Sequence, residues 1–374
     1  MDKWLLLLTL VLFALGLVMV FSASNVAAFM RYDTSPYRFV LKQGLFLLVS
    51  FILALIMLRI NTKVYGFLSW PMMLVILGLL AAVFIYGKTT NQATSWFAIK
   101  GFTLQPSEFA KVIVIIWLAS FYGINKNRLD KYIPVISPIL ISLIGTVLIM
   151  LQPDLGTAII YTLIIAFIFF IVPIEKVVKL KIILGTVVLG IIGVVVLIIA
   201  GKNPISERQL SRFDFSKPCS EEKFYTDGNQ VCNAYIAINN GGLTGKGLGN
   251  STQKYLYLPE AHTDFIFAIL LEELGLIAGA AVIIVYMLIL ARIVTIGRRS
   301  HNISNSIMCY AIAFYIFLHI VVNLMGIFGM MPMTGVPLPF LSYGGSFTMC
   351  LVVSLAIVQR VSIENKLFQE KRNS

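Results

Sequence analysis

Three acidic residues stand at points where apolar stretches of the sequence begin. Glu108 lies in "LQPSE", Asp154 in "LQPDLG" and Asp264 in "AHTDFIFA". Carboxylates are common at helix N-termini, because the helix dipole favours negative charge there. Three carboxylates brought together could instead abstract a proton or hold a divalent cation. Both interpretations stay open for each acid, and Asp264 is the best candidate for a general base.

The residues around these acids fit the starts of helices. Pro106 and Pro153 come shortly before two of the acids. Proline is favoured at the first helical position, because its missing N–H would be unpaired there. Thr263 directly precedes Asp264 and is a candidate N-cap for the next helix. We therefore expect three helices that begin at the same, outer membrane surface.

Lys111 follows Glu108 by three residues, so the two side chains share one face of a helix. Ionisable residues in or beside membrane spans are costly, and a functional role is their default interpretation. A structural ion pair that locks helices together is the alternative, and it stays open. Glu272 and Glu273 lie two turns beyond Asp264, and on a helical wheel neither forms a carboxylate pair with it.

The elements that position these residues are expected to be membrane-spanning helices. Of the 374 residues, 59% are hydrophobic and 12% are charged, and the mean hydropathy is +0.90. A helix needs about 20 apolar residues to cross about 30 Å of hydrocarbon. Ten such stretches cover residues 4–23, 40–58, 66–86, 107–124, 134–152, 155–172, 180–200, 263–291, 307–328 and 342–360.

These stretches predict an all-α polytopic membrane protein with ten transmembrane helices. Residues 1–374 would form one domain, with a large extracellular loop at about 201–262 between helices 7 and 8. The first stretch is longer than the apolar region of a signal peptide, so we expect it to be retained.

The net charge of +12 follows from the expected topology. With the N-terminus inside, the short outer loops hold only Arg31, Arg38, Lys88 and Lys100. The inner segments hold sixteen basic residues: Lys3, Arg59, Lys63, Lys126, Arg128, Lys131, Lys176, Lys179, Lys181, Arg292, Arg298, Arg299, Arg360, Lys366, Lys371 and Arg372. This positive-inside pattern predicts that both termini are cytoplasmic. Anionic lipid headgroups account for the basic charge, so no nucleic-acid partner is expected.

The four cysteines divide into two pairs by position. Cys309 and Cys350 lie in predicted spans and are expected to be apolar packing residues. Cys219 and Cys232 share the extracellular loop, where a disulfide could form; a bridge and two free thiols both stay open. The three histidines fall in separate segments, which argues against a His-rich zinc site.

The segment "GIFGMMPMTGVPLPFLSYGGS", residues 326–346, holds three prolines and five glycines and cannot be one continuous helix. Irregular backbone at membrane depth persists only where protein or a wet cavity satisfies it. The segment is more apolar than a solvent loop, which favours a cavity that opens outward over a plain loop.

The segment "NNGGLTGKGLGNS", residues 239–251, superficially suggests a phosphate-binding loop. The first glycine of that motif is replaced by Asn240, and Lys246 is followed by Gly247 instead of Ser or Thr. We therefore predict a flexible glycine-rich loop, whose N–H groups could still contact an anionic lipid headgroup.

Four segments, in this order along the chain, resemble the shape, elongation, division and sporulation (SEDS) family, which includes FtsW and RodA. They are "QPSEFAK", "QPDLGT", "GKGLGNSTQKYLYLPEAHTDFIFA" and "PMTGVPLPFLSYGGS". The resemblance extends from "VFSAS", residues 20–24, to the last span. "VFSAS" and "PEAHTDFIFA" are more similar to the division members of the family.

The resemblance implies a peptidoglycan glycosyltransferase that polymerises lipid II at the outer face of the bacterial cytoplasmic membrane during cell division. The family's essential aspartate corresponds to Asp264, which would deprotonate a sugar hydroxyl directly or through a bound Mg²⁺ or Mn²⁺ ion. Other functionally sensitive positions correspond to Glu108, Lys111 and Asp154. Further substrate-binding or supporting candidates in the matching segments are His262, Thr263, Ser342 and Gly344.

The implied partners are lipid II, an undecaprenyl-linked glycan, a class B penicillin-binding transpeptidase and other divisome proteins at the septum. One departure from the family matters. Many members carry Arg before the Trp of a "GARRW"-like stretch, whereas this chain has Ser95 before Trp96 in "NQATSW". A role of that arginine cannot be transferred to this chain.

Three alternatives to a division polymerase stay open at this point. An elongation-type polymerase would have the same chemistry in a different cell process. A lipid II flippase would use the same polar residues and would move lipid without lengthening glycan. A scaffold would recruit a separate synthase and would not depend on Asp264 for growth.

Overall fold

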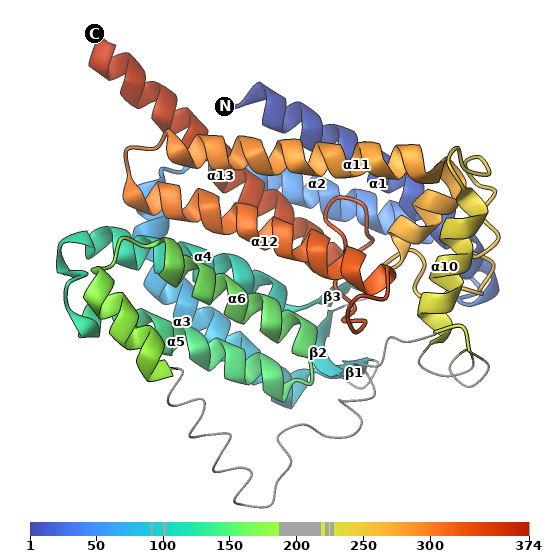
Figure 1. The fold of residues 1–374 in the computed structure, drawn as a ribbon, viewed down its shortest axis with the longest axis horizontal. Coiled ribbons are helices and arrows are strands. Elements are labelled where there is room, and N and C mark those ends of the chain that lie inside the picture. Colours follow the sequence, from blue (N-terminus) through green and yellow to red (C-terminus); the bar gives the residue numbers. More distant parts are fainter. Residues whose placement is uncertain (91–92, 100–101, 187–217, 221–223, 225–227, 374) are drawn as a thin grey trace, which may run out of the picture.

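The computed structural model describes residues 1–90, 93–99, 102–186, 218–220, 224 and 228–373 (Figure 1). The helices named here are α1 (Lys3–Met30), α2 (Arg38–Arg59), α3 (Thr62–Tyr86), α4 (Pro106–Ile124), α5 (Tyr132–Leu151), α6 (Leu155–Ile171), α10 (Asn229–Gly241), α11 (Ile266–Arg298), α12 (Ile303–Ile327) and α13 (Gly345–Asn373).

The predicted polytopic helical membrane fold is confirmed. Eight of these helices are long and apolar enough to cross a membrane, and α6 is a shorter apolar helix. Together they account for nine of the ten predicted spans. The remaining one, residues 180–200, lies mostly outside the described residues, although residues 176–186 are helical.

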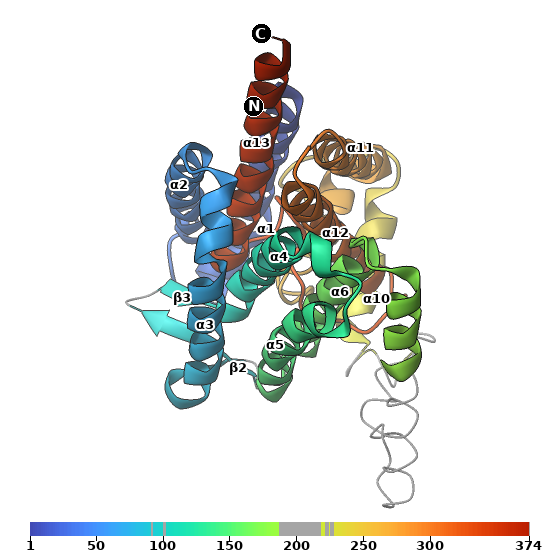
Figure 2. The same cartoon turned by 90° about the vertical axis from the view of Figure 1, so that its left-hand side faces the viewer.

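Helices α4 and α12 lie in the middle of the bundle, surrounded by α3, α6, α11 and α13 (Figure 2). Most of the apolar stretch of each is buried, whereas α2 buries only 17% of its own. Large side chains such as Trp117 and Tyr122 on α4 and Tyr315 on α12 are fully buried. The polar residues of α4 and α12 therefore face protein and not lipid.

A small antiparallel sheet joins α3 to α4, an element that the sequence analysis did not predict. Its strands are β1 (Lys88–Thr90), β2 (Ala93–Ile99) and β3 (Phe102–Leu104), in the order β1-β2-β3. Phe97 pairs with Leu104 and Ile99 with Phe102. The sheet lies beside the N-terminal end of α4, so it contributes to the same end of the bundle as Glu108.

Both chain termini lie at the opposite end of the bundle (Figure 1). The backbone N–H of Asp2 donates to Oε1 of Gln359 over 2.7 Å, and Nε2 of Gln359 donates to the carbonyl of Asp2 over 2.9 Å. The carboxylate of Asp2 also pairs with Arg292. These contacts tie α1, α11 and α13 together at this end.

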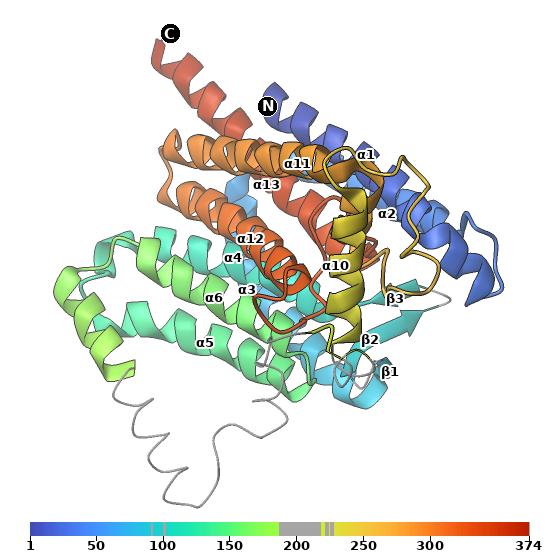
Figure 3. The same ribbon diagram turned by 45° about the vertical axis from the view of Figure 1, so that its right-hand side comes forward.

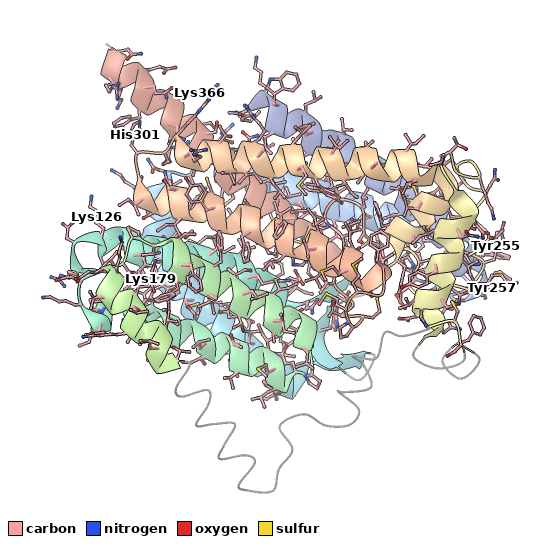
Figure 4. All side chains as sticks on the ribbon, in the orientation of Figure 1. Lys126, Lys179, Tyr255, Tyr257, His301 and Lys366 are labelled. Atoms are coloured by element: carbon pink, nitrogen blue, oxygen red, sulfur yellow. A yellow bond between two sulfur atoms is a disulfide. The ribbon has the colours of Figure 1, made fainter. Side chains whose placement is uncertain are left out.

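The two ends differ in their exposed side chains (Figure 4). Lys126, Lys179 and Lys366 lie at the end that carries the termini, while Tyr255 and Tyr257 lie at the other end. Both tyrosines are more than half exposed. Three of the lysines that the positive-inside pattern assigns to the inner side thus lie at the end that carries the termini.

Helix α10 packs across the ends of α11 and α12 within the predicted extracellular loop (Figure 3). Cys219 and Cys232 form a disulfide with their Cα atoms 5.1 Å apart, so the bridged interpretation is confirmed. The hydroxyl of Tyr235 donates to the carbonyl of Phe328 over 2.9 Å. α10 is thereby tied to the Gly- and Pro-rich segment that follows α12.

Helix α11 is interrupted at Gly275, where φ is +81° and ψ is 175°. The span predicted over 263–291 is present, but it contains an interruption that the sequence analysis did not predict. The N–H groups of Leu276 and Ile277 donate to the carbonyls of Gly242 and Leu243 instead of continuing the helix. Such backbone angles are accessible almost only to glycine.

The glycine-rich segment 239–251 is held against this interruption, which contradicts the expected flexible loop. The N–H groups of Lys246 and Gly247 donate to the carbonyls of Glu272 and Glu273. The carboxylate of Glu273 accepts a 3.0 Å bond from Nζ of Lys254. Both glutamates thus have partners other than Asp264, which agrees with the prediction that neither forms a carboxylate pair with it.

Replacing Gly275 with alanine is expected to destabilise the protein by about 2–3 kcal/mol, since the alanine would have to adopt backbone angles that are accessible almost only to glycine. Its Cβ would also lie 2.3 Å from the carbonyl oxygen of Leu243. Thermal unfolding of the purified protein measures the effect. Gly78→Ala is the matched control, because a Cβ there meets nothing within 4 Å; an equal loss in both variants would contradict the prediction.

Candidate functional site

A cavity of about 320 Å³ lies at the end of the bundle that carries the sheet and α10. The N-terminal ends of α4 and α6, the turn before α11 and the segment between α12 and α13 all contribute to its wall. Glu108, Asp154 and Asp264 line it together. The three acids that the sequence placed on separate helices are therefore neighbours, and the predicted cavity is present.

Asp264 lies in the turn that precedes α11. No residue in the described part of the chain donates a hydrogen bond to its carboxylate. The backbone carbonyl of Asp264 accepts a 2.8 Å bond from Nδ2 of Asn323. A Cβ on Gly335 would lie 3.4 Å from Oδ2 of Asp264, so the glycine leaves this oxygen open to the cavity. The carboxylate is therefore positioned through its backbone and remains available to a ligand.

Burial, followed by the nearby charge of Glu260, raises the pKa of Asp264 to about 7. Glu260 lines the same cavity. Its own carboxylate accepts a 3.1 Å bond from the hydroxyl of Thr263 and lies 3.9 Å from a guanidinium nitrogen of Arg31. A carboxyl with a pKa near neutrality is well matched to accept a proton at physiological pH.

Glu108 and Lys111 form the ion pair that their spacing predicts. Nζ of Lys111 lies 2.8 Å from Oε1 of Glu108, and both side chains are almost fully buried. Nζ also lies 3.0 Å from Nε2 of His319 on α12. The second carboxylate oxygen of Glu108 has no hydrogen-bond partner among the described residues. Glu108 is part of the cavity wall, and its ion pair with Lys111 is linked to α12 through His319.

Asp154 is the N-cap of α6, since its Oδ1 accepts a 3.1 Å bond from the N–H of Thr157. Its Oδ2 accepts a 2.9 Å bond from Nε2 of Gln105. Pro106 is the first residue of α4, as predicted, but α6 begins at Leu155, so Pro153 precedes its helix. Asp154 therefore connects the starts of α4 and α6.

Thr263 is not the N-cap of α11, because that helix begins at Ile266 after Phe265. The chain makes a turn over residues 260–265, in which Thr263 bonds to Glu260. The carbonyl of Thr263 accepts a hydrogen bond from the hydroxyl of Ser342. Thr263 and Gly344 line the cavity, and Ser342 holds the turn from outside it.

His262 does not line the cavity that holds Asp264. Its ring packs 4.6 Å from that of Phe39 and 5.7 Å from that of Tyr343. It borders a second cavity, which it shares with Arg31 and Lys254. Burial lowers the pKa of His262. The imidazole is therefore placed to support the turn and not to exchange protons with Asp264.

The cavity suits a cation that is completed by substrate oxygens. Mg²⁺ keeps several waters and commonly binds one or two carboxylates together with substrate phosphates. Asp264 and Glu260 offer such oxygens. Across the described ranges, no three His, Cys, Asp or Glu side chains gather as metal ligands. The residues thus fit a shared site and not a metal cage built by protein alone.

Several residues of the site were not predicted from the sequence. Glu260 stands four residues before Asp264, and an acid so close to the candidate base could have been noticed. Gln105 stands in the quoted segment "LQPSE", directly before Pro106, but it was not singled out. His319 and Asn323 reach the site only through the packing of helices that are distant in sequence, and no local pattern marks them.

Comparisons with known proteins agree with this arrangement. A family model of cell cycle proteins of the FtsW, RodA and SpoVE type matches residues 3–367. A probable peptidoglycan glycosyltransferase FtsW from Bacillus subtilis is 34% identical, over 99% of this chain and 93% of its own. Its counterpart from Coxiella burnetii is 33% identical, over 98% and 97%.

Two solved structures share the fold. A chain of a peptidoglycan synthase complex, studied for the structural coordination of polymerization and crosslinking, is 24% identical with a TM-score of 0.75; the match covers 97% of this chain and 98% of that one. The rod shape determining protein RodA of Thermus thermophilus is 24% identical with a TM-score of 0.67, and 97% of each chain is covered.

Proposed function

The chain belongs to the family of FtsW, RodA and SpoVE cell cycle proteins, and we propose on this premise that it polymerises lipid II into glycan strands. It is a peptidoglycan glycosyltransferase. Relatives that carry this name match it over almost their whole length. The observation that carries the proposal is the open carboxylate of Asp264 in a cavity bordered by three helix starts.

Asp264 acts as the general base. Its carboxylate takes the proton from a sugar hydroxyl of an incoming lipid II, and the hydroxyl oxygen forms a bond to the anomeric carbon of the growing glycan. The bond from that carbon to undecaprenyl diphosphate breaks, and the diphosphate leaves with the electron pair. Because the displacement occurs in one step without a covalent bond between sugar and protein, the anomeric centre is inverted.

The charged residues beside Asp264 prepare the cavity for an anionic leaving group. Positive helix ends favour phosphate, and α4 and α6 both begin at the cavity. Lys111 adds a buried cation one turn inside α4. Asp264 would hold a Mg²⁺ or Mn²⁺ ion together with substrate oxygens, and such an ion supplies charge neutralisation for the diphosphate.

The cell-level part of the proposal is division at the septum. The protein lies in the bacterial cytoplasmic membrane with both termini inside, so the cavity opens on the outer face where lipid-linked glycan is polymerised. A class B penicillin-binding transpeptidase and other divisome proteins are its partners. The FtsW names of the relatives and the position of the termini at one end support this assignment.

A gel assay with purified protein and lipid II tests the function, run with and without a chelator and with and without a candidate transpeptidase. Glycan ladders that depend on the protein are expected. Transport of labelled lipid II in vesicles without any ladder would instead identify a flippase. A protein that localises correctly but neither polymerises nor transports lipid II would be a scaffold.

The polymerisation rate is expected to rise with pH and to level off above about pH 7. As long as no cation is bound to it, Asp264 has a raised pKa, so its base form dominates above that value and each pH unit below it should lower kcat/KM about tenfold. A bound cation would lower this pKa and shift the profile to lower pH. Initial rates between about pH 5.5 and 8.5 provide the profile. A flat profile over this range would argue against Asp264 as the titrating base.

A further inference from the structure

We propose that His319 is a positioning residue of this site, which sets the distance between the Glu108–Lys111 pair and Asp264. It does so by holding Lys111 from one ring nitrogen and the cavity wall at Pro337 from the other. The inference rests on the proposed function, because glycan polymerisation supplies one of its readouts.

The hydrogen bonds of His319 fix which ring nitrogen carries the proton. Nζ of Lys111 lies 3.0 Å from Nε2, and an ammonium can only donate, so Nε2 must be an unprotonated acceptor. Nδ1 lies 3.3 Å from the carbonyl oxygen of Pro337, which can only accept. The imidazole is therefore neutral with its proton on Nδ1, and it connects a donor on α4 to an acceptor in the cavity wall.

Packing holds this imidazole in one orientation. His319 is fully buried. Its ring stacks on that of Phe347 with centroids 4.5 Å apart, and the ring of Tyr315 meets it edge-on at 4.9 Å. Phe347 itself lines the cavity. A ring held between two hydrogen bonds and two aromatic neighbours transmits position, because neither hydrogen bond can move without the other.

Asn323 makes the complementary contact one helical turn further along α12. Its Nδ2 donates to the carbonyl of Asp264 and to the carbonyl of Val336, each over 2.8 Å. Thus His319 and Asn323 hold the consecutive residues Val336 and Pro337 from the same helix. Helix α12 therefore holds both the backbone of Asp264 and the cavity wall at Val336 and Pro337 in fixed positions.

Two substitutions separate this role from simple core packing. A glutamine at 319 offers an acceptor for Lys111 and a donor for the carbonyl of Pro337, whereas a leucine fills the space but offers neither. His319→Gln is expected to keep kcat for lipid II within about threefold, and His319→Leu to lower it at least about tenfold with little change in KM. Misplacement of reacting groups acts on the chemical step more than on binding.

Thermal unfolding of both variants accompanies the kinetics. If His319→Leu does not fold, His319→Asn replaces it. Asparagine has the same acceptor and donor as glutamine, but its side chain is too short to reach both Lys111 and the carbonyl of Pro337. This variant should lose kcat where His319→Gln retains it. Wild-type kcat in His319→Leu or His319→Asn, or an equal loss in His319→Gln, would overturn the proposal.

The tautomer provides a test that needs neither activity nor a disruptive variant. The chain has three histidines, so selective ¹⁵N-histidine labelling gives a simple solid-state NMR spectrum. One imidazole should carry its proton on Nδ1 with Nε2 as acceptor, and this signal should vanish in His319→Gln. A proton on Nε2, or on both nitrogens, would refute the inference.

The outcomes keep the two proposals apart. If the wild-type protein makes no glycan with its transpeptidase present, the proposed function fails, while the NMR result still decides the geometry at His319. If the wild type makes glycan and His319→Leu makes it equally well, the proposed function stands and only the role of His319 is lost.

Discussion

Glycan polymerisation is expected to fall at least about 100-fold when Asp264 is replaced by asparagine, the low end of the loss of a general base. The amide cannot accept the proton of the attacking hydroxyl. The protein should still fold, since no described residue donates a hydrogen bond to this carboxylate and its backbone carbonyl is held by Asn323. Ladder formation from lipid II measures the change.

Asp130→Asn is the matched control for this experiment, because that acid is exposed and follows α4 at the opposite end of the bundle from the cavity. It should leave the rate unchanged. Thermal unfolding of both variants checks that the fold is kept. Wild-type ladders from the Asp264→Asn protein would exclude the carboxylate as the base and would return the scaffold and flippase interpretations to consideration.

Removing Lys111 alone is expected to destabilise the protein by about 3–5 kcal/mol, since Lys111→Met would leave the charge of Glu108 buried without its partner. Nζ of Lys111 is also bonded to His319, so the cost extends to α12. The free energy of unfolding in detergent, or the shift in melting temperature, reports the loss. Lys126→Met, at an exposed lysine, should change stability by less than about 0.5 kcal/mol.

The double variant Glu108→Gln/Lys111→Met separates stability from catalysis. Replacing both partners of a buried ion pair by neutral groups is often close to neutral for stability, so most of the loss should be recovered. Polymerisation should nevertheless remain low, because the buried cation behind Glu108 in the cavity wall is gone. Recovery of both stability and activity would show that the pair is structural only, the alternative that the sequence left open.

The identity of several residues of this site could be predicted from the sequence, whereas much of the geometry around them could not. The pairing of Glu108 with Lys111 follows from a three-residue spacing on one helix, and Pro106 marks the first residue of α4 through its missing N–H. Such signals are local. A membrane-spanning helix can also be predicted from the local sequence, through its length and its apolar side chains.

What the sequence could not predict depends on contacts between distant segments. The turn over 260–265 replaces the expected cap at Thr263 because Glu260 and Ser342 bind it, and Ser342 lies 79 residues away. The interruption at Gly275 exists because the segment around Leu243 supplies the hydrogen bonds that the helix gives up. His319 has no local pattern, since its partners belong to α4 and to the segment after α12.

The contacts between Asp2 and Gln359 join residues that are 357 positions apart. α1 is translated long before α13, so these contacts can form only late in synthesis. Until then α1 can pack against α2 and, once it has been made, against α11. A chain without α13 would keep the ion pair of Asp2 with Arg292 but would leave the backbone N–H and carbonyl of Asp2 without Gln359.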